Sequence, residues 1–138
     1  MSINFKKYVW LILLSFSFLS FTDWGIEEGL ASYYHDDFNG KKTTSGERFD
    51  NTKLIAAHKK YPFGTLIKVT NLSNKAWVVV RVADRGPHSQ KRVIDLSKAA
   101  FNSISSISKG VIKVKVELYK PDSLKTASVS TESQKIIE

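Results

Sequence analysis

The run 76–83, AWVVVRVA, constrains the fold most, because it is β-branched nearly throughout and stops abruptly before Asp84. Residues of this kind favour strands, and the Arg-Gly-Pro sequence after Asp84 is a strong turn signal. A strand this apolar is expected to be covered on both faces. The run therefore predicts a buried strand that delivers one carboxylate to a fixed position beside a rigid turn.

Further short segments have strand character, and Gly- or Pro-containing turns separate them. They are 29–34, 54–58, 65–71 and 111–120. The last alternates regularly, with aliphatic side chains on one face and charged ones on the other. Several short strands in a domain of about 95 residues predict a small closed barrel, because closure removes exposed strand edges.

One short helix fits the sequence, at 98–104, with Ser97 as its N-cap and Gly110 closing the loop that follows. The chain contains no cysteine, so the domain depends on its hydrophobic core and not on disulfides. His35 and His58 are far apart in the sequence, and no thiolate accompanies them. We therefore expect no metal site and no cofactor.

The two ends of the chain have a different composition from the middle. Residues 1–22 carry a positive start and a short apolar core, the pattern of a secretory signal peptide. An uncleaved N-terminal anchor is the alternative, but the core is shorter than the ~20 residues of a membrane span. We expect an exported domain at 23–120, in the periplasm or cell envelope, with no integral membrane span once the leader is removed. Without a cysteine there is no lipobox, and residues 121–138 are expected to be a disordered tail.

The formal net charge of +8 favours polyanionic partners of some kind. The basic residues form no stripe, however, and Lys113 and Lys115 alternate with aliphatic residues as on a solvated strand face. Nucleic acid is not an expected partner of an exported protein. An anionic cell envelope is the remaining partner that the charge would suit.

Asp84 is the main candidate for chemistry. Burial at the end of a strand raises the pKa of a carboxyl group, as a general acid near neutral pH requires. Arg85 would act in the opposite direction if its guanidinium paired with Asp84. The sequence leaves both readings open: a structural pair, or a free acid beside an arginine that points elsewhere.

The other candidates are also ambiguous. His58 follows two alanines, so it is either a hydrogen-bonding scaffold residue or a residue beside a ligand. Glu47 and Asp50 lie three apart, as a carboxylate pair or as two acids of a solvated loop. Tyr33 and Tyr34 could form a stacking platform for sugars. Adjacent strand residues face opposite ways, so at most one of these tyrosines is expected to line a groove.

Taken together, five motifs resemble one family. Between residues 29 and 118 the chain contains, in order, Thr-Ser-Gly-Glu, Ala-Ala-His, Pro-Phe-Gly-Thr, Asp-Arg-Gly-Pro and Ile-Asp-Leu-Ser. In order and spacing they resemble the rare lipoprotein A family, also called septal ring lytic transglycosylases. The resemblance implies an all-β fold, a six-stranded double-psi β-barrel with one short helix, of the kind also found in expansins.

The resemblance also implies an activity. It is the non-hydrolytic cleavage of the MurNAc–GlcNAc bond of peptidoglycan to 1,6-anhydroMurNAc ends, with a preference for glycan strands stripped of their peptides. Separately, we expect the protein to be a monomer. Asp84 would be the general acid, and Arg85 and Asp95 would be structural. Matching positions give the expected catalytic residues as Asp84, His58 and Glu47, and the expected substrate-binding residues as Ser32, Tyr33, Tyr34, Asp50 and Phe63.

A single acid suits this reaction better than hydrolysis, which commonly needs two carboxylates, because the sugar supplies its own nucleophile. Two alternatives remain open at this stage. One is a non-catalytic, expansin-like module that binds glycan or loosens the wall, and the other is a purely structural envelope protein.

Overall fold

The computed structural model describes residues 24–121. The proposed signal peptide, and all but the first residue of the proposed tail, lie outside the described residues and stay predictions. The elements run in the order β1 (Glu27–Tyr33), η2 (Asp36–Phe38), β2 (Ile55–His58), β3 (Leu66–Asn71), β4 (Trp77–Asp84), β5 (Arg92–Leu96), α2 (Lys98–Ile104), η3 (Ile107–Lys109) and β6 (Ile112–Leu118).

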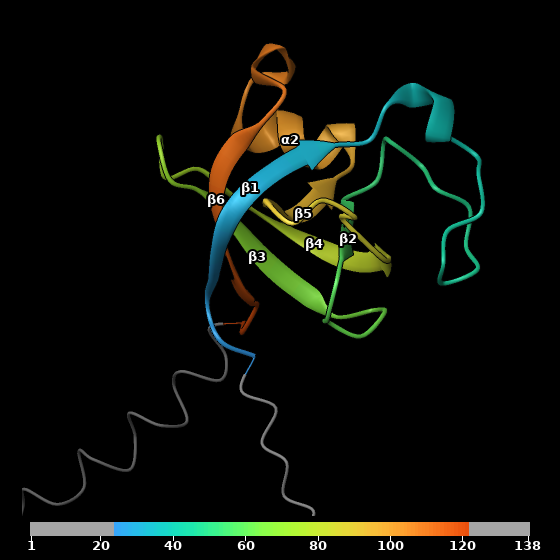
Figure 1. Cartoon of the computed structure of the whole chain (residues 1–138), viewed down its shortest axis with the longest axis horizontal. Coiled ribbons are helices and arrows are strands. Elements are labelled where there is room, and N and C mark those ends of the chain that lie inside the picture. Colours follow the sequence, from blue (N-terminus) through green and yellow to red (C-terminus); the bar gives the residue numbers. More distant parts are fainter. Residues whose placement is uncertain (1–23, 122–138) are drawn as a thin grey trace, which may run out of the picture.

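The six strands close into a barrel in the order β1-β5-β2-β4-β3-β6 (Figure 1). The pairs β1–β5 and β2–β4 are parallel, and the other pairs are antiparallel. The last strand, β6, pairs with the first, so every strand has two hydrogen-bonded neighbours. The expected all-β, six-stranded barrel with one short helix is confirmed.

Alternation along the strands separates the barrel interior from its outer surface. On β4, Val78, Val80 and Val82 are buried, whereas Trp77 is 55 % exposed. The expectation that this run is covered on both faces is therefore wrong. A strand in a small barrel has only one face toward the packed interior, and more than half of the Trp77 side chain stays open to solvent on the outer face.

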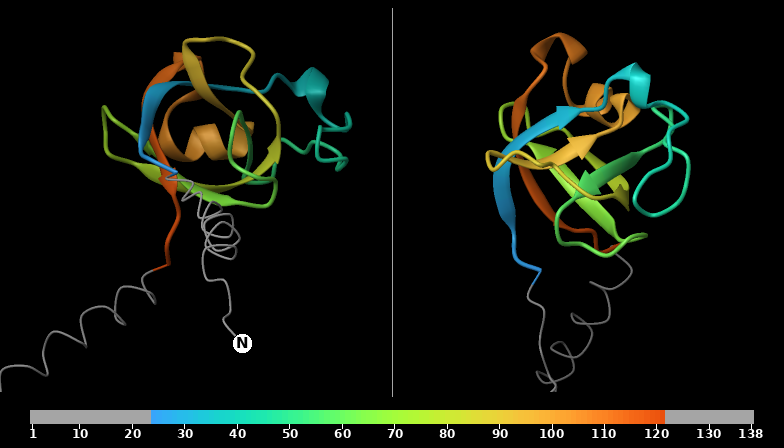
Figure 2. Two further views of the ribbon diagram at one scale, coloured as in Figure 1. Left: turned by 60° about the horizontal axis from the view of Figure 1, so that its bottom comes forward. Right: turned by 45° about the vertical axis from the view of Figure 1, so that its right-hand side comes forward.

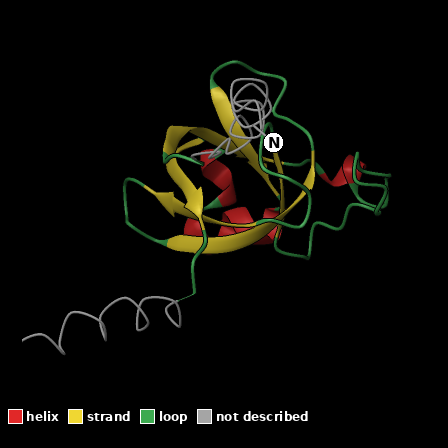
Figure 3. Ribbon diagram, turned by 90° about the horizontal axis from the view of Figure 1, so that it is seen from below, coloured by secondary structure: helices red, strands yellow, loops and turns green. Residues whose placement is uncertain are grey.

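The helix α2 fills one end of the barrel (Figures 2 and 3). Its Ala100, Phe101 and Ile104 are buried and belong to the same core as the inward-facing strand residues. The Ser97 hydroxyl accepts a hydrogen bond from the Ala100 amide at 3.3 Å and donates one to the Lys53 carbonyl at 2.5 Å. The expected N-cap is thus confirmed, and it also ties the helix to the loop before β2.

A long connection between β1 and β2 leaves the barrel at one side (Figure 1). It contains η2 and an isolated antiparallel bridge between Lys42 and Arg48. This connection covers part of the barrel end where β4 finishes, and so it forms one wall of the pocket described below. Within residues 24–121, no helix has the length and apolar character needed to cross a bilayer.

Candidate active site

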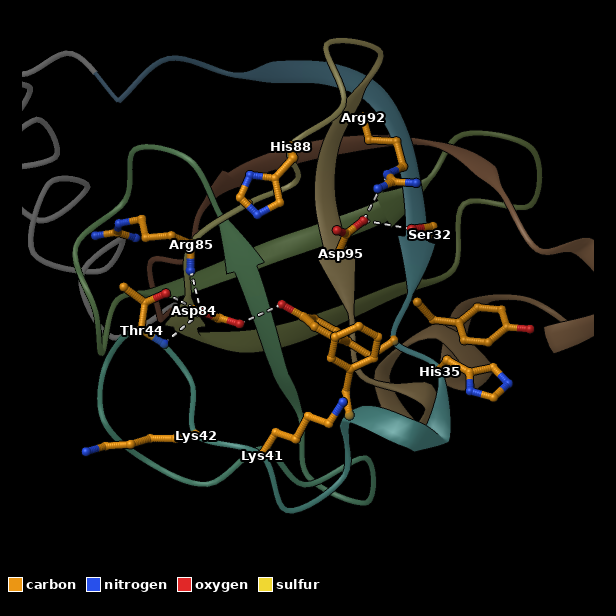
Figure 4. A pocket seen from close by; sticks show the side chains of 14 residues that line it. Ser32, His35, Lys41, Lys42, Thr44, Asp84, Arg85, His88, Arg92 and Asp95 are labelled. Atoms are coloured by element: carbon orange, nitrogen blue, oxygen red, sulfur yellow. Dashed lines mark hydrogen bonds and ion pairs between the residues drawn. The ribbon is translucent and has the colours of Figure 1, made fainter.

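A pocket of about 580 Å³ lies beside the end of β4 (Figure 4). Its walls come from the end of β1, the long β1–β2 connection, the turn after β4, and β5. The lining residues are Ser32, Tyr33, Tyr34, His35, Phe38, Lys41, Lys42, Thr44, Asp84, Arg85, Gly86, His88, Arg92 and Asp95.

Asp84 is held in this pocket by four hydrogen bonds (Figure 4). Its Oδ1 accepts from the Thr44 amide at 2.8 Å, the Thr44 hydroxyl at 2.7 Å and the Arg85 amide at 2.9 Å. Its Oδ2 accepts from the Tyr34 hydroxyl at 2.8 Å. A carboxylate offers about four acceptor positions, so Oδ1 is fully engaged while Oδ2 can still receive a proton or a further donor.

The surroundings fix the charge of Asp84. Burial raises its pKa, as expected from the sequence, but hydrogen bonds from Thr44, Tyr34 and the Arg85 amide outweigh burial and bring the pKa below its ordinary value. The pKa of Tyr34 is raised, mainly by burial and then by its bond to Asp84. In the free protein, therefore, Asp84 is a carboxylate at neutral pH and Tyr34 is its donor.

The guanidinium of Arg85 points away from Asp84. Its Nη1 donates to the His58 carbonyl at 3.1 Å and to the Tyr61 carbonyl at 2.8 Å, and the guanidinium lies 4.0 Å from the centre of the Phe63 ring. Of the two readings of the Asp-Arg pair, the structure has the one in which the guanidinium does not pair with the acid. Gly86 follows with φ +140°, which side-chain-bearing residues rarely adopt.

A second carboxylate, Asp95 of β5, lines the same pocket. It accepts a hydrogen bond from the Ser32 hydroxyl at 2.7 Å, and the Arg92 Nε lies 3.1 Å from its Oδ1. Ser32 and Asp95 are direct partners in the parallel β1–β5 register. Asp95, expected to be structural, is thus both anchored and in contact with the pocket.

His58, expected to be catalytic, does not line the pocket that contains Asp84. Its side chain is 1 % exposed. The ring Nδ1 accepts from the amides of Lys60 and Tyr61 at 3.1 Å each, and Nε2 lies 3.2 Å from a carboxylate oxygen of Glu27. Burial lowers the pKa of His58, although Glu27 acts in the opposite direction. The contacts are those of a scaffold residue.

Three other expected residues also lie outside the pocket lining. Both carboxylate oxygens of Glu47 accept from the Arg81 guanidinium at 2.9 Å. Asp50 accepts from the hydroxyl and the amide of Thr52 within its own loop. Glu47 and Asp50 therefore form no carboxylate pair, and Phe63 is engaged by Arg85.

Ser32, Tyr33 and Tyr34 all line the pocket, so the expectation that only one tyrosine would do so is wrong. β1 ends at Tyr33, and the chain beyond it no longer alternates as a strand. The Tyr33 ring also packs against Phe101, with ring centres 4.9 Å apart. The sequence reasoning missed Thr44, whose only signal was its place inside the Thr-Ser-Gly-Glu region.

In the described part of the chain, no group of three His, Cys, Asp or Glu residues could hold a metal ion. The polar groups that converge on the pocket are carboxylates, hydroxyls and cationic side chains. This arrangement is suited to proton transfer and to binding a hydroxylated, anionic ligand.

The closed barrel contains two parallel strand pairs and has a carboxylate-lined pocket at one end. Together with the family match that follows, this makes the fold a double-psi β-barrel. The chain belongs to the family described as Lytic transglycolase, whose profile matches residues 26–116. The resemblance seen in the five sequence motifs is thereby confirmed.

Named relatives are similar to the same region. The chain is 51 % identical over 92 residues to endolytic peptidoglycan transglycosylase RlpA of Haemophilus influenzae, covering 67 % of this chain and 32 % of that protein. It is 48 % identical over 91 residues to the protein of that name in Campylobacter jejuni, covering 66 % and 33 %. The chain therefore spans about a third of the length of these relatives.

Two solved structures share the fold. Streptomyces papain inhibitor superposes with a TM-score of 0.57 at 23 % identity, over 70 % of this chain and 96 % of that one. A point mutant of a Clavibacter michiganensis expansin, in complex with cellohexaose, gives 0.57 at 20 % identity, over 70 % and 51 %. At these identities the likeness concerns the fold alone.

Proposed function

We propose that this chain is an exported, monomeric lytic transglycosylase that cleaves peptidoglycan glycan strands endolytically in the periplasm or cell envelope. The observation that carries the proposal is the placement of Asp84: it lines the pocket, the guanidinium of Arg85 binds elsewhere, and among the described residues its Oδ2 accepts one hydrogen bond. The family and the printed names of the relatives support the substrate and the reaction.

In this proposal Asp84 acts twice. In its protonated form it gives its proton to the glycosidic oxygen as the bond from that oxygen to C1 of MurNAc breaks. The C6 hydroxyl of the same sugar then bonds to C1, and its proton passes to Asp84. The products are a 1,6-anhydro end and a new sugar hydroxyl, and no water is consumed. One carboxyl group is therefore sufficient, because the proton that Asp84 gives to the glycosidic oxygen is replaced by the proton from the C6 hydroxyl.

Asp95 has a separate part in the proposal. Its contacts with Ser32 and Arg92 fix it across the pocket from Asp84 (Figure 4). A fixed carboxylate stabilises the positive charge that develops on the sugar ring as the glycosidic bond breaks. We assign His58 and Glu47 no contact with substrate, because neither lines the pocket.

We further propose that the preferred substrate is a glycan strand stripped of its peptides. Removal of the peptide leaves the lactyl group of MurNAc as a free carboxylate. Lys41 reaches toward the pocket centre, with its Nζ 5.0 Å from the centre of the Phe38 ring, and Lys42 lies at the rim (Figure 4). Neither lysine has a carboxylate within 4.0 Å among the described residues, so both can pair with an anionic strand.

The test uses the purified protein with peptide-free and peptide-bearing strands, and mass spectrometry of the products. We expect anhydro-terminated fragments, more of them from peptide-free strands, and none with Asp84→Asn. Glu117→Gln, a carboxylate change on β6 outside the pocket, should leave the products unchanged. Absence of anhydro ends from both substrates would refute the proposed reaction.

The alternative is a non-catalytic, expansin-like module that binds or loosens the wall. The ionised state of Asp84 in the free protein favours it. This alternative predicts that the protein sediments with sacculi, that Asp84→Asn still sediments, and that no soluble fragments appear.

A further inference from the structure

The segment 42–48 is a compact loop placed against Asp84. The bridge between Lys42 and Arg48 closes it. Inside it, the amide and hydroxyl of Thr43 donate to the Glu47 carbonyl at 2.8 and 3.0 Å, and the Gly46 amide donates to the Thr43 carbonyl at 3.0 Å. These bonds give the loop a defined shape, so its residues have fixed positions relative to one another.

Two contacts join this loop to β4. Thr44 donates its amide and its hydroxyl to Oδ1 of Asp84. Glu47 forms a two-bond ion pair with Arg81, which lies three residues before Asp84 on the same strand. The two hydrogen bonds of this pair lower the pKa of Glu47 and raise that of Arg81. A bidentate pair also fixes orientation, so it holds the loop in the register that puts Thr44 on Asp84.

The hydrogen bonds make the two oxygens of Asp84 unequal. Two of the donors to Oδ1 are backbone amides, which can only donate, so a proton on Oδ1 would displace a bond. Among residues 24–121, the single donor to Oδ2 is the Tyr34 hydroxyl, which can rotate from donor to acceptor. A proton therefore enters on Oδ2 without breaking the contacts on Oδ1.

We propose that loop 42–48 is the positioning element of Asp84: Thr44 occupies Oδ1, the Glu47–Arg81 ion pair keeps Thr44 in place, and Oδ2 is the oxygen that carries the proton. This inference rests on the proposed function and assigns positioning roles to Thr44, which lines the pocket, and to Glu47 and Arg81, which do not. It connects Glu47, which lies outside the pocket, to Asp84 inside it through Arg81 and Thr44.

Several charged or titratable groups line the same pocket as Asp84. Tyr34 and His35 follow β1, Lys41 and Lys42 come from the long connection, and Arg85 and His88 come from the turn after β4. Arg92 and Asp95 come from β5. The variants below keep all of these unchanged, so a change in pH dependence can be assigned to loop 42–48.

The first test compares Thr44→Val, which keeps the shape but loses the hydroxyl, with Thr44→Ser, which keeps the hydroxyl. Activity is expected to fall as rising pH deprotonates Asp84. Because the Thr44 hydroxyl lowers the pKa of Asp84, Thr44→Val should move this fall to higher pH and reduce kcat about tenfold through misplacement, with KM little changed. Thr44→Ser should keep the wild-type profile.

Thr52→Val is the matched control, because Thr52 makes the same pair of bonds to Asp50 outside the pocket. It should leave both kcat and the pH profile unchanged. An unshifted pH profile for Thr44→Val would overturn the inference.

The second test separates positioning from direct catalysis by Glu47. Glu47→Gln and Arg81→Met should have similar effects, and each should add little to Thr44→Val, because all three act through one contact. A loss of activity with Glu47→Gln that Arg81→Met does not reproduce, in variants with wild-type thermal unfolding, would overturn the inference in favour of a catalytic glutamate.

An NMR titration of the Asp84 carboxyl carbon gives a readout that does not depend on activity. Thr44→Val should raise the pKa of Asp84 even if no glycan is cleaved. If the wild type is inactive but this shift occurs, the proposed function fails while the positioning role stands. If the wild type is active and no shift occurs, the positioning role fails alone.

Discussion

Arg85 offers a quantitative test of how the turn after β4 is held. We consider Arg85→Met, which keeps an unbranched apolar chain over Phe63 but removes the guanidinium. The substitution loses two hydrogen bonds to backbone carbonyls, those of His58 and Tyr61. Bonds from a charged donor contribute about 1.5–3 kcal/mol each, and the stacking on an aromatic ring about 0.5–1 kcal/mol.

Because Arg85 is only partly buried, the lower end of these ranges applies. We expect the free energy of unfolding to fall by about 3–4 kcal/mol, a large part of the ~5–15 kcal/mol of a typical domain. For a domain of this size, each 1 kcal/mol lowers Tm by about 4–8 °C. The acceptors are neutral carbonyls, so added salt should change the loss little.

Urea and thermal unfolding of the full chain measure this effect. Arg48→Met is the matched control, because Arg48 makes one bond to the Gly40 carbonyl and is exposed; its loss should stay below about 1 kcal/mol. A loss for Arg85→Met no larger than that for Arg48→Met would refute the reasoning that Arg85 fixes the turn beside Asp84.

Two further predictions concern stability. Burial lowers the pKa of His58 in the fold, so the unfolded chain binds a proton there first as the pH falls below about 6.5. The unfolding free energy should therefore decrease from about pH 7 to about pH 5. In urea titrations, His58→Gln should show a smaller decrease over this range. An equal decrease in both proteins would contradict the assignment of this pH dependence to His58. Ser97→Ala loses the N-cap bond and the bond to Lys53 and should cost about 1–2 kcal/mol, with an unchanged urea m-value. A loss below about 0.5 kcal/mol would contradict this role of the hydroxyl.

The sequence predicted the strands whose residues alternate or are β-branched throughout, and it missed β5, whose residues show neither pattern. β6 alternates regularly, and both β4 and β6 lie within two residues of their expected ends. β5 was not expected from the residues, because it is five residues long and has only Val93, Ile94 and Leu96 as apolar members. It forms a strand because it pairs with β1 and β2. The residues of 92–96 alone contain no information about that pairing.

In the candidate site, too, the sequence predicted what a local pattern shows and missed what depends on contacts between distant residues. Asp84 was identified because a strand end and a turn lie together in the sequence. Thr44 lies 40 positions away, and its contact with Asp84 depends on how loop 42–48 docks on β4. The partner of Glu47 is Arg81, 34 positions away. A local pattern marks where polar residues gather, but not which of them meet across the fold.

The strand order of the barrel has a consequence for biosynthesis. β1 pairs with β5 and β6, the last two strands in the described part of the chain. A nascent chain that has not reached Leu118 leaves its first strand without one of its two partners. Long-range pairing of this kind delays folding, so the barrel closes only after β6 has been synthesised. In the export proposed above, such a delay would keep the chain extended for passage through a translocation channel.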